Sequence, residues 1–247
     1  MSFNRRAAAL VLFAVTTTLG VSAQSSSSSE GVPQATASQP GSGAASVQAR
    51  VRERRAKRRA AAIHDTYDNL YDFNFGSGFL RFTPGPGATG GSGGLQKLNE
   101  YLWDVSVSRY FSRNTSVVVD ARGNYGTAYL GNNQYDKVKP AISQYMVMAG
   151  PSYRFVLKPR WSVSGRVLAG GAYGNFLGDT GGYTAGELGL YPDGAGFAAS
   201  AGLPLEYNLT PTASLRVTPE YVLTNFGSTI QSNIGVTAGL VIRFGKQ

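Results

Sequence analysis

The sequence predicts an all-β fold: an eight-stranded antiparallel up-and-down transmembrane β-barrel, preceded by a disordered and basic N-terminal extension. Three observations predict it. Eight runs between residues 71 and 244 alternate apolar and polar side chains, which is the period of a strand with two different faces. The connections between the runs alternate between short and long. Aromatic residues gather toward both ends of the runs, as in the girdles of membrane barrels.

Composition narrows the possible classes before any motif is considered. The chain has 247 residues with 32 glycines, no cysteine and one histidine, and only 15% of its residues are charged. The absence of cysteine excludes a disulfide scaffold and a thiolate metal cluster. The single histidine removes most histidine-based catalysis.

The amino terminus has the pattern of a secretory signal. Arg5 and Arg6 precede an uncharged apolar run at 7–15, and a small-residue cleavage motif ends at Ala23. The alternative is a membrane anchor, but the apolar run is too short to span a bilayer as a helix. We therefore expect residues 1–23 to be a cleaved signal peptide and the protein to be exported.

Two segments of different composition separate this signal from the predicted barrel. Residues 24–46 are rich in Ser, Gly, Pro, Ala and Gln, a low-complexity linker that buries too little apolar surface to fold. Residues 47–70 form a basic periplasmic segment, with seven basic residues and one acid within 47–62. One interpretation is an arm that binds an anionic periplasmic surface through residues 50–59; the other is a solvated, partly helical linker. Nucleic acid is not expected as a partner of an exported protein.

The predicted barrel covers residues 71–247. Its strands are expected at 71–82, 102–111, 116–125, 144–155, 161–173, 197–207, 215–223 and 234–244. The first is the least regular, because Phe73, Phe75 and Phe79 are in phase whereas Leu80 and Phe82 are out of phase. Tight turns are expected at 111–116, 155–161 and 207–213, and longer loops at 83–98, 126–141, 175–196 and 226–232. Short turns at one end and long loops at the other are typical of an up-and-down barrel.

The two faces of the strands differ in chemistry. One face is apolar and the other carries charges. Alternation alone also allows a barrel with its apolar face inside and its polar face in water. Aromatic residues decide between the two, because a water-surrounded core gives no reason to sort them to both ends. Tyr71, Phe111, Phe155, Trp161, Tyr207 and Phe244 fall near the short-turn end, and Tyr101, Trp103, Tyr125, Tyr145, Tyr173, Phe197 and Tyr221 fall toward the long-loop end.

With these features, residues 71–244 resemble the outer-membrane β-barrel domain family, the small OmpA-like eight-stranded barrels of Gram-negative bacteria. The resemblance implies a location in the cell outer membrane, surrounded by its lipids. It also implies that the assembly machinery recognises the C-terminal strand at 234–244, which ends on the aromatic Phe244. Residues 245–247 extend beyond that aromatic, which departs mildly from the family pattern.

The sequence offers little for catalysis. Outer-membrane hydrolases of this shape use a barrel histidine as a base, and residues 71–247 contain none. His64 with Asp65 and Asp68 could ligate a metal, but nothing else supports such a site. We therefore predict no enzyme activity, no cofactor and no metal site.

The charged face is the most informative feature for function. An eight-stranded barrel is just wide enough for side chains to fill it, so inward arginines are expected to pair with the carboxylates. The predicted lumenal charge network contains Arg81, Asp104, Asp120, Arg122, Arg154, Arg166, Glu206, Arg216, Glu220 and Arg243. The leading hypothesis is a plugged barrel with a structural or surface-interaction role that displays its long loops outside. The alternative is a narrow porin-like diffusion channel with weak anion preference, since six of these charges are basic and four acidic.

Overall fold

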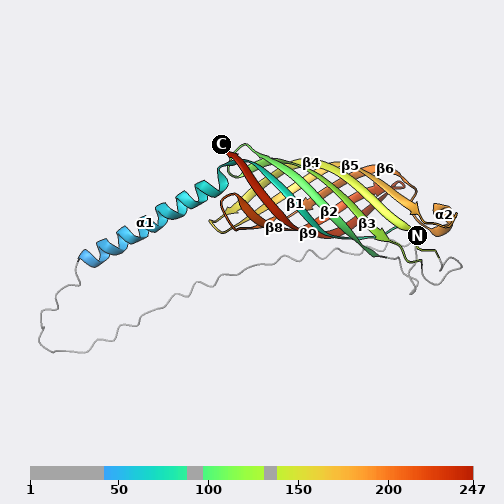
Figure 1. Cartoon of the computed structure of the whole chain (residues 1–247), viewed down its shortest axis with the longest axis horizontal. Helices are drawn as coiled ribbons and strands as arrows, with labels where there is room; N and C mark the ends of the chain where they lie inside the picture. Colours follow the sequence, from blue (N-terminus) through green and yellow to red (C-terminus); the bar gives the residue numbers. More distant parts are fainter. Residues whose placement is uncertain (1–41, 88–96, 131–137, 247) are drawn as a thin grey trace, which may run out of the picture. The chain divides into compact units, whose positions relative to one another are not determined.

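The computed structural model describes residues 42–87, 97–130 and 138–246, with side chains from residue 47 onward. The chain divides into two units, Met1–Ser46 and Val47–Gln247, and most of the second unit is a β-barrel (Figure 1). The predicted signal peptide at 1–23 lies outside the described residues, as does the predicted linker up to residue 41.

Nine strands form the barrel wall, and they follow one another around it in chain order. They are β1 (Asn69–Phe82), β2 (Leu98–Tyr110), β3 (Thr115–Thr127), β4 (Ala141–Leu157), β5 (Trp161–Gly178), β6 (Gly194–Gly202), β7 (Leu205–Asn208), β8 (Ala213–Phe226) and β9 (Thr229–Lys246). β6 and β7 both pair with β5 on one side and β8 on the other, so they are two halves of one interrupted strand. The wall therefore has eight antiparallel positions, as the sequence predicts.

The ring closes through β1, which pairs with β2 on one edge and with β9 on the other. Because both registers run without a shift, successive side chains of β1 alternate strictly between the two faces. Phe73 and Phe75 are exposed on the outside, whereas Asp72 and Asn74 are buried inside. The apolar face is the outer one, which is the arrangement of a transmembrane barrel.

The connections have the predicted asymmetry, with one correction. Short turns join β2 to β3, β4 to β5 and β7 to β8, whereas residues 83–97, 128–140 and 179–193 connect the strands at the other end. The segment at 226–232, expected to be a longer loop, is instead a two-residue hairpin turn at Gly227 and Ser228. Both have positive φ, 58° and 62°, the backbone of a type I′ turn, whose twist matches that of the flanking strands.

Two helices accompany the barrel. α1 (Ser42–Tyr67) is rich in arginine and alanine, both strong helix formers, and contains an exposed pair between Lys57 and Glu53 at 2.8 Å. α2 (Ala185–Leu188) lies in the connection between β5 and β6 and begins with a capping box in which Thr184 and Glu187 bond each other's backbone. The Thr184 backbone N–H and hydroxyl hold the pKa of Glu187 below its ordinary value. Within the described ranges, no helix is both long enough and apolar enough to cross a membrane.

Candidate functional site

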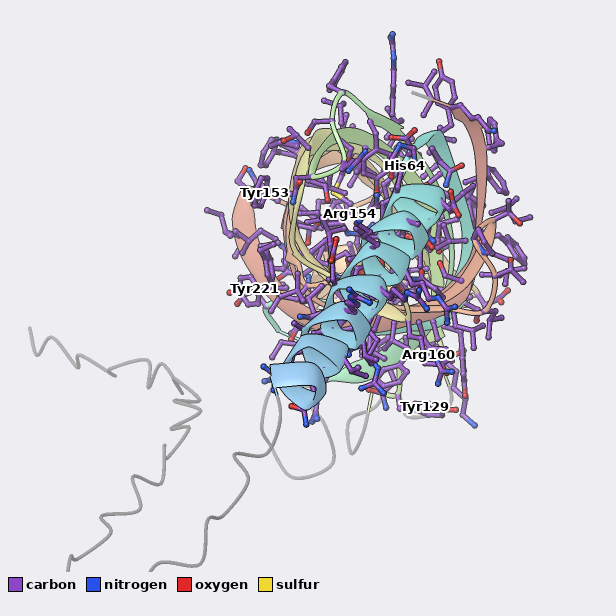
Figure 2. The ribbon with its side chains drawn as sticks, turned by 90° about the vertical axis from the view of Figure 1, so that its left-hand side faces the viewer. His64, Tyr129, Tyr153, Arg154, Arg160 and Tyr221 are labelled. Atoms are coloured by element: carbon purple, nitrogen blue, oxygen red, sulfur yellow. The ribbon has the colours of Figure 1, made fainter. Side chains whose placement is uncertain are left out.

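The lumen of the barrel contains nine of the ten charges predicted to face it. All nine are buried: Asp104, Asp120, Arg122, Arg154, Arg166, Glu206, Arg216, Glu220 and Arg243. They come from seven of the strands and converge because each occupies an inward position of its strand. Figure 2, viewed along the barrel, shows Arg154 within the ring of strands and Tyr153 and Tyr221 on its outer side.

Arg81 is the exception, and its predicted inward position is wrong. It is exposed and lies opposite Asn99 of β2 and Ile234 of β9 in uninterrupted ladders. Since the ladder has no bulge, Arg81 shares the outer face with Phe79, two residues before it. Leu80 and Phe82, the residues out of phase in the sequence, are the ones that point inward.

The first group of lumenal charges, the central cluster, lies midway along the barrel and comprises Asp104, Asp120, Arg122, Arg166 and Glu220. The Arg122 guanidinium is 2.8 Å from an Asp120 oxygen, 2.5 Å from Glu220 and 3.6 Å from Asp104. Arg166 contacts the other carboxylate oxygen of Asp120 at 3.3 Å and that of Glu220 at 3.2 Å. Two guanidinium groups therefore tie together carboxylates from three strands.

The second group, the end cluster, lies near the short turns and comprises Asp72, Arg154, Glu206, Arg216 and Arg243. Glu206 is the hub, with Arg216 and Arg243 each 2.6 Å from its carboxylate oxygens. Arg154 lies 2.6 Å from Asp72, and Arg216 also approaches Asp72 at 3.6 Å. Each of these side chains is at most 6% exposed, so the charges are removed from bulk water and lie beside charges of opposite sign.

Two tyrosines and one asparagine complete the end cluster. The Tyr110 hydroxyl donates to Asp72 at 3.0 Å, and its ring centroid is 3.9 Å from the Arg154 guanidinium. Tyr67, at the end of α1, is fully buried, and the guanidiniums of Arg154 and Arg243 each lie 5.2 Å from its ring centroid. Asn208 donates to the Tyr67 hydroxyl at 2.7 Å. Tyr67 thus closes the short-turn end of the lumen.

Most of an apolar cluster lies in the opposite half of the lumen, toward the long loops. Its member Val118 lies instead beside the small cavity between the two charge clusters. Its members are Leu80, Phe82, Leu98, Leu102, Val118, Ala128, Leu130, Ile142, Met146, Met148, Leu168, Ala172, Phe176, Leu188, Leu190, Tyr191, Ala198, Val222 and Phe226. Phe176 is central to it, with ring centroids 5.1 Å from Phe226 and 5.9 Å from Tyr191. We call this cluster the apolar plug. Because α2 and the residues after it contribute Leu188 and Tyr191, the loop itself seals the lumen.

Little space remains between these groups. A lumenal cavity that touches Arg166 of the central cluster and Glu206 and Arg216 of the end cluster has a volume of about 10 Å³. That is about the smallest cavity able to hold one water molecule. At this level of the barrel, the described side chains therefore pack closely against one another.

Several residues of this interior were missing from the predicted network. Asp72 and Glu100 are carboxylates with 1% and 0% exposure, and Glu100 accepts two hydrogen bonds from Gln144 at 2.9 Å. The signal that could have found them is parity: Asp72 shares its face with Asn74, and Glu100 shares its face with Asp104. The apolar plug was signalled in the same way, by the out-of-phase Leu80 and its counterparts on other strands.

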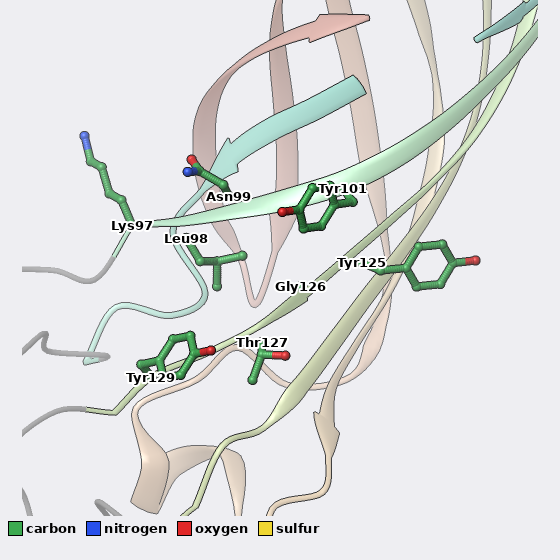
Figure 3. Close-up of a pocket in the computed structure, with 8 residues that line it drawn as sticks. All are labelled: Lys97, Leu98, Asn99, Tyr101, Tyr125, Gly126, Thr127 and Tyr129. Carbon is green, nitrogen blue, oxygen red and sulfur yellow. The ribbon is translucent and has the colours of Figure 1, made fainter. Parts of the chain in front are cut away.

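The outer face carries an aromatic girdle near the long loops. Trp103 donates to the Tyr125 hydroxyl at 3.4 Å, and Tyr125 donates to Tyr145 at 3.2 Å. A surface groove of about 500 Å³ lies next to this girdle and is lined by Lys97, Leu98, Asn99, Tyr101, Tyr125, Gly126, Thr127 and Tyr129 (Figure 3). Aromatic rings with polar tips at the edge of an apolar band are typical of a membrane–water boundary.

His64, considered in the sequence as a metal ligand with Asp65 and Asp68, lies close to Asp68. His64 Nε2 is 3.6 Å from Asp68, whose other oxygen is 3.5 Å from Arg113. Among the described residues, no three His, Asp or Glu side chains lie together in a way that could hold a metal ion.

Several solved structures of small membrane barrels resemble this architecture. The closed ring, with apolar side chains outside and charges inside, is a transmembrane β-barrel. Solved structures similar to it include neisserial surface protein A, NspA (11% identity, 70% of this chain and 97% of that chain, TM-score 0.49). Another is Ail of Yersinia pestis, crystallised with the heparin analogue sucrose octasulfate (15% identity, 70% of this chain and 97% of that chain, TM-score 0.43). A third is the outer membrane protein OprG of Pseudomonas aeruginosa (15% identity, 72% of this chain and 98% of that chain, TM-score 0.43). No protein-family model matches the chain, and no curated protein matches it in sequence. At such identities the likeness concerns the fold, and the fold itself rests on the strand pairing of this chain.

Proposed function

We propose that the protein is an integral outer-membrane β-barrel with a closed lumen, and that its role is structural or one of surface interaction. The filled lumen is the observation that carries the proposal. The end cluster, the central cluster and the apolar plug follow one another along the barrel, and the cavity between the two clusters measures about 10 Å³. An ion could pass only if several of these groups moved together.

The charge count also argues against an anion-selective channel. Glu100 is a further inward carboxylate outside the two clusters, so the named inward acids are no fewer than the arginines. The predicted excess of basic residues disappears because Arg81 faces outward and Asp72 faces inward. The two clusters hold five arginines and five carboxylates: Arg122, Arg154, Arg166, Arg216 and Arg243 with Asp72, Asp104, Asp120, Glu206 and Glu220. Paired charges of equal number attract neither sign of ion preferentially.

Planar-bilayer conductance of the refolded protein tests the proposal. A heat-modifiability gel establishes that the barrel has folded, and an open porin in the same bilayer serves as the positive control. A folded and silent barrel is the expected result. Steady, ion-selective openings would favour the narrow diffusion channel instead and would make the central cluster its filter.

The proposed surface-interaction role rests on the long connections, which remain available for binding when the lumen is closed. The connections at the long-loop end include residues 83–97, 128–140 and 179–193, and we propose that they face outward from the cell, as long barrel loops do. We propose no catalytic role, because residues 71–247 contain no histidine to act as a base. Binding of intact cells to candidate host or matrix ligands, compared with the variant Tyr183→Ala at an exposed loop position outside the apolar plug, would test the role of this loop.

The remaining partners are those of any protein inserted in this membrane. Outer-membrane lipids surround the apolar outer face, and we propose that the assembly machinery recognises β9. Phe244, near the end of β9, is half exposed and stacks on Tyr71 of β1 at 5.6 Å between ring centroids. Phe244→Ala should reduce the yield of folded barrel in cells while leaving refolding in detergent intact.

A further inference from the structure

A groove at the short-turn end of the barrel combines cations with apolar side chains. We call it the rim groove. It has a volume of about 580 Å³ and is lined by Arg59 and Ile63 of α1, by Leu157 at the end of β4, and by Lys158, Arg160 and Trp161. Figure 2 shows Arg160 at the rim of the strand ring. No carboxylate is among the residues that line it.

The groove's chemistry fits an amphiphile with a negative head. Arg59, Lys158 and Arg160 are exposed, and none of them is within 4 Å of a carboxylate among the described residues. Trp161 is 46% exposed, and Ile63 and Leu157 are half-buried, so an apolar floor lies beside the cations. A small soluble anion would use the cations and leave this floor exposed to water.

Hydrogen bonds of its backbone hold the turn between β4 and β5, which carries Lys158 and Arg160. Lys158 N–H donates to the Trp161 carbonyl at 2.9 Å and closes the turn. The Tyr67 hydroxyl donates to the Lys158 carbonyl at 2.8 Å, and the backbone N–H of Asn208 donates to the Arg160 carbonyl at 2.8 Å. These bonds fix the backbone positions from which the two cationic side chains extend.

The groove opens onto the part of the outer face that would contact lipid. Trp161 is the first residue of β5, pairs in register with Tyr207 of β7, and both rings are exposed on the outside. Phe155, also exposed, lies on the neighbouring β4. A phosphate in the groove would therefore place its attached acyl chains along this aromatic belt, where lipid chains belong in a membrane barrel.

We propose that the rim groove binds an anionic phospholipid of the membrane leaflet at the short-turn side, with its phosphate between Arg59, Lys158 and Arg160. Arginine and lysine are the usual phosphate-binding side chains. This inference rests on the proposed placement in the membrane. It assigns anionic phospholipid as the ligand of the basic segment at residues 47–70. It differs from general attraction to the arginines of α1, because only Arg59 of that series lines the groove.

Native mass spectrometry of the detergent-solubilised full chain tests the proposal, with phosphatidylglycerol and phosphatidylcholine as probes. The groove variant R59Q/K158Q/R160Q and the control variant R52Q/R54Q/R55Q remove the same number of charges. The wild type and the control variant should retain phosphatidylglycerol in preference to phosphatidylcholine. The groove variant should lose at least about tenfold of that preference, because each cation near a membrane surface adds to lipid attraction.

Three results would overturn the proposal. Equal loss in the groove and control variants would show unspecific attraction to a basic helix. Equal retention of the two lipids by the wild type would show that charge plays no part. Displacement of phosphatidylglycerol by inorganic phosphate alone would show a site for soluble anions.

Two further measurements distinguish a loss of lipid binding from a failure to fold and from a failure of the proposed closed lumen. A heat-modifiability gel shows whether each variant is folded, and K158Q/R160Q, which leaves α1 unchanged, replaces the triple variant if that one fails to fold. Conductance of the same samples reports on the lumen, which the rim groove does not enter. A conducting barrel with an intact lipid preference would refute the closed lumen and leave the groove standing.

Discussion

Replacing Arg122 by methionine removes one of the two guanidiniums that hold the central cluster together. Its side chain is 1% exposed and contacts Asp120, Glu220 and Asp104. Arg166 would remain as the cluster's cation, at 3.3 Å from Asp120 and 3.2 Å from Glu220. Breaking a buried charge pair by removing one partner costs about 3–5 kcal/mol, because the other charge stays buried without compensation. We expect the free energy of unfolding to fall by that amount.

The assay is urea unfolding of the refolded barrel in lipid vesicles, followed by tryptophan fluorescence and by the heat-modifiability gel. Arg81→Met is the matched control, because the outward and exposed Arg81 should change stability by no more than about 0.5 kcal/mol. The permeability of the Arg122 variant should stay unchanged. A loss of less than about 1 kcal/mol, or a changed conductance with intact stability, would refute a structural role for the cluster. Arg216→Met, in the end cluster, should behave in the same way.

Three other substitutions and one mass measurement have defined outcomes. Tyr67→Phe deletes the hydroxyl that bonds both Lys158 and Asn208, and it should lower the free energy of unfolding by about 1–2 kcal/mol. An unchanged free energy of unfolding would show that the end of α1 does not close the lumen. Leu188→Ala, at a residue 2% exposed in the apolar plug, should cost about 2–5 kcal/mol in urea unfolding. Gly227→Ala places a side chain at φ 58° and should cost about 1–2 kcal/mol, unless the turn rearranges. The intact mass of the exported protein should correspond to a chain that starts at Gln24.

Much of the barrel could be read from the sequence because strand geometry is local. A period of two separates the faces of each strand, and the eight predicted runs all lie in the barrel wall. Where the prediction failed, a local rule was overlooked. Arg81 was assigned to the charged face by its chemistry, whereas the unbroken ladder of β1 places it outside. Residues 226–232 were expected to form a longer loop, but positive φ at Gly227 and Ser228 lets two residues make the turn.

The sequence by itself separated the two faces of most strands, because alternation depends only on neighbours along one strand. Only the tertiary structure decided which charges meet. Arg122 reaches Glu220, 98 positions away, and Asn208 reaches Tyr67, 141 positions away. It also decided that most of the apolar plug lies in the long-loop half of the lumen. These contacts depend on how the strands are staggered around the closed ring, and stagger is a property of the whole barrel rather than of any one strand.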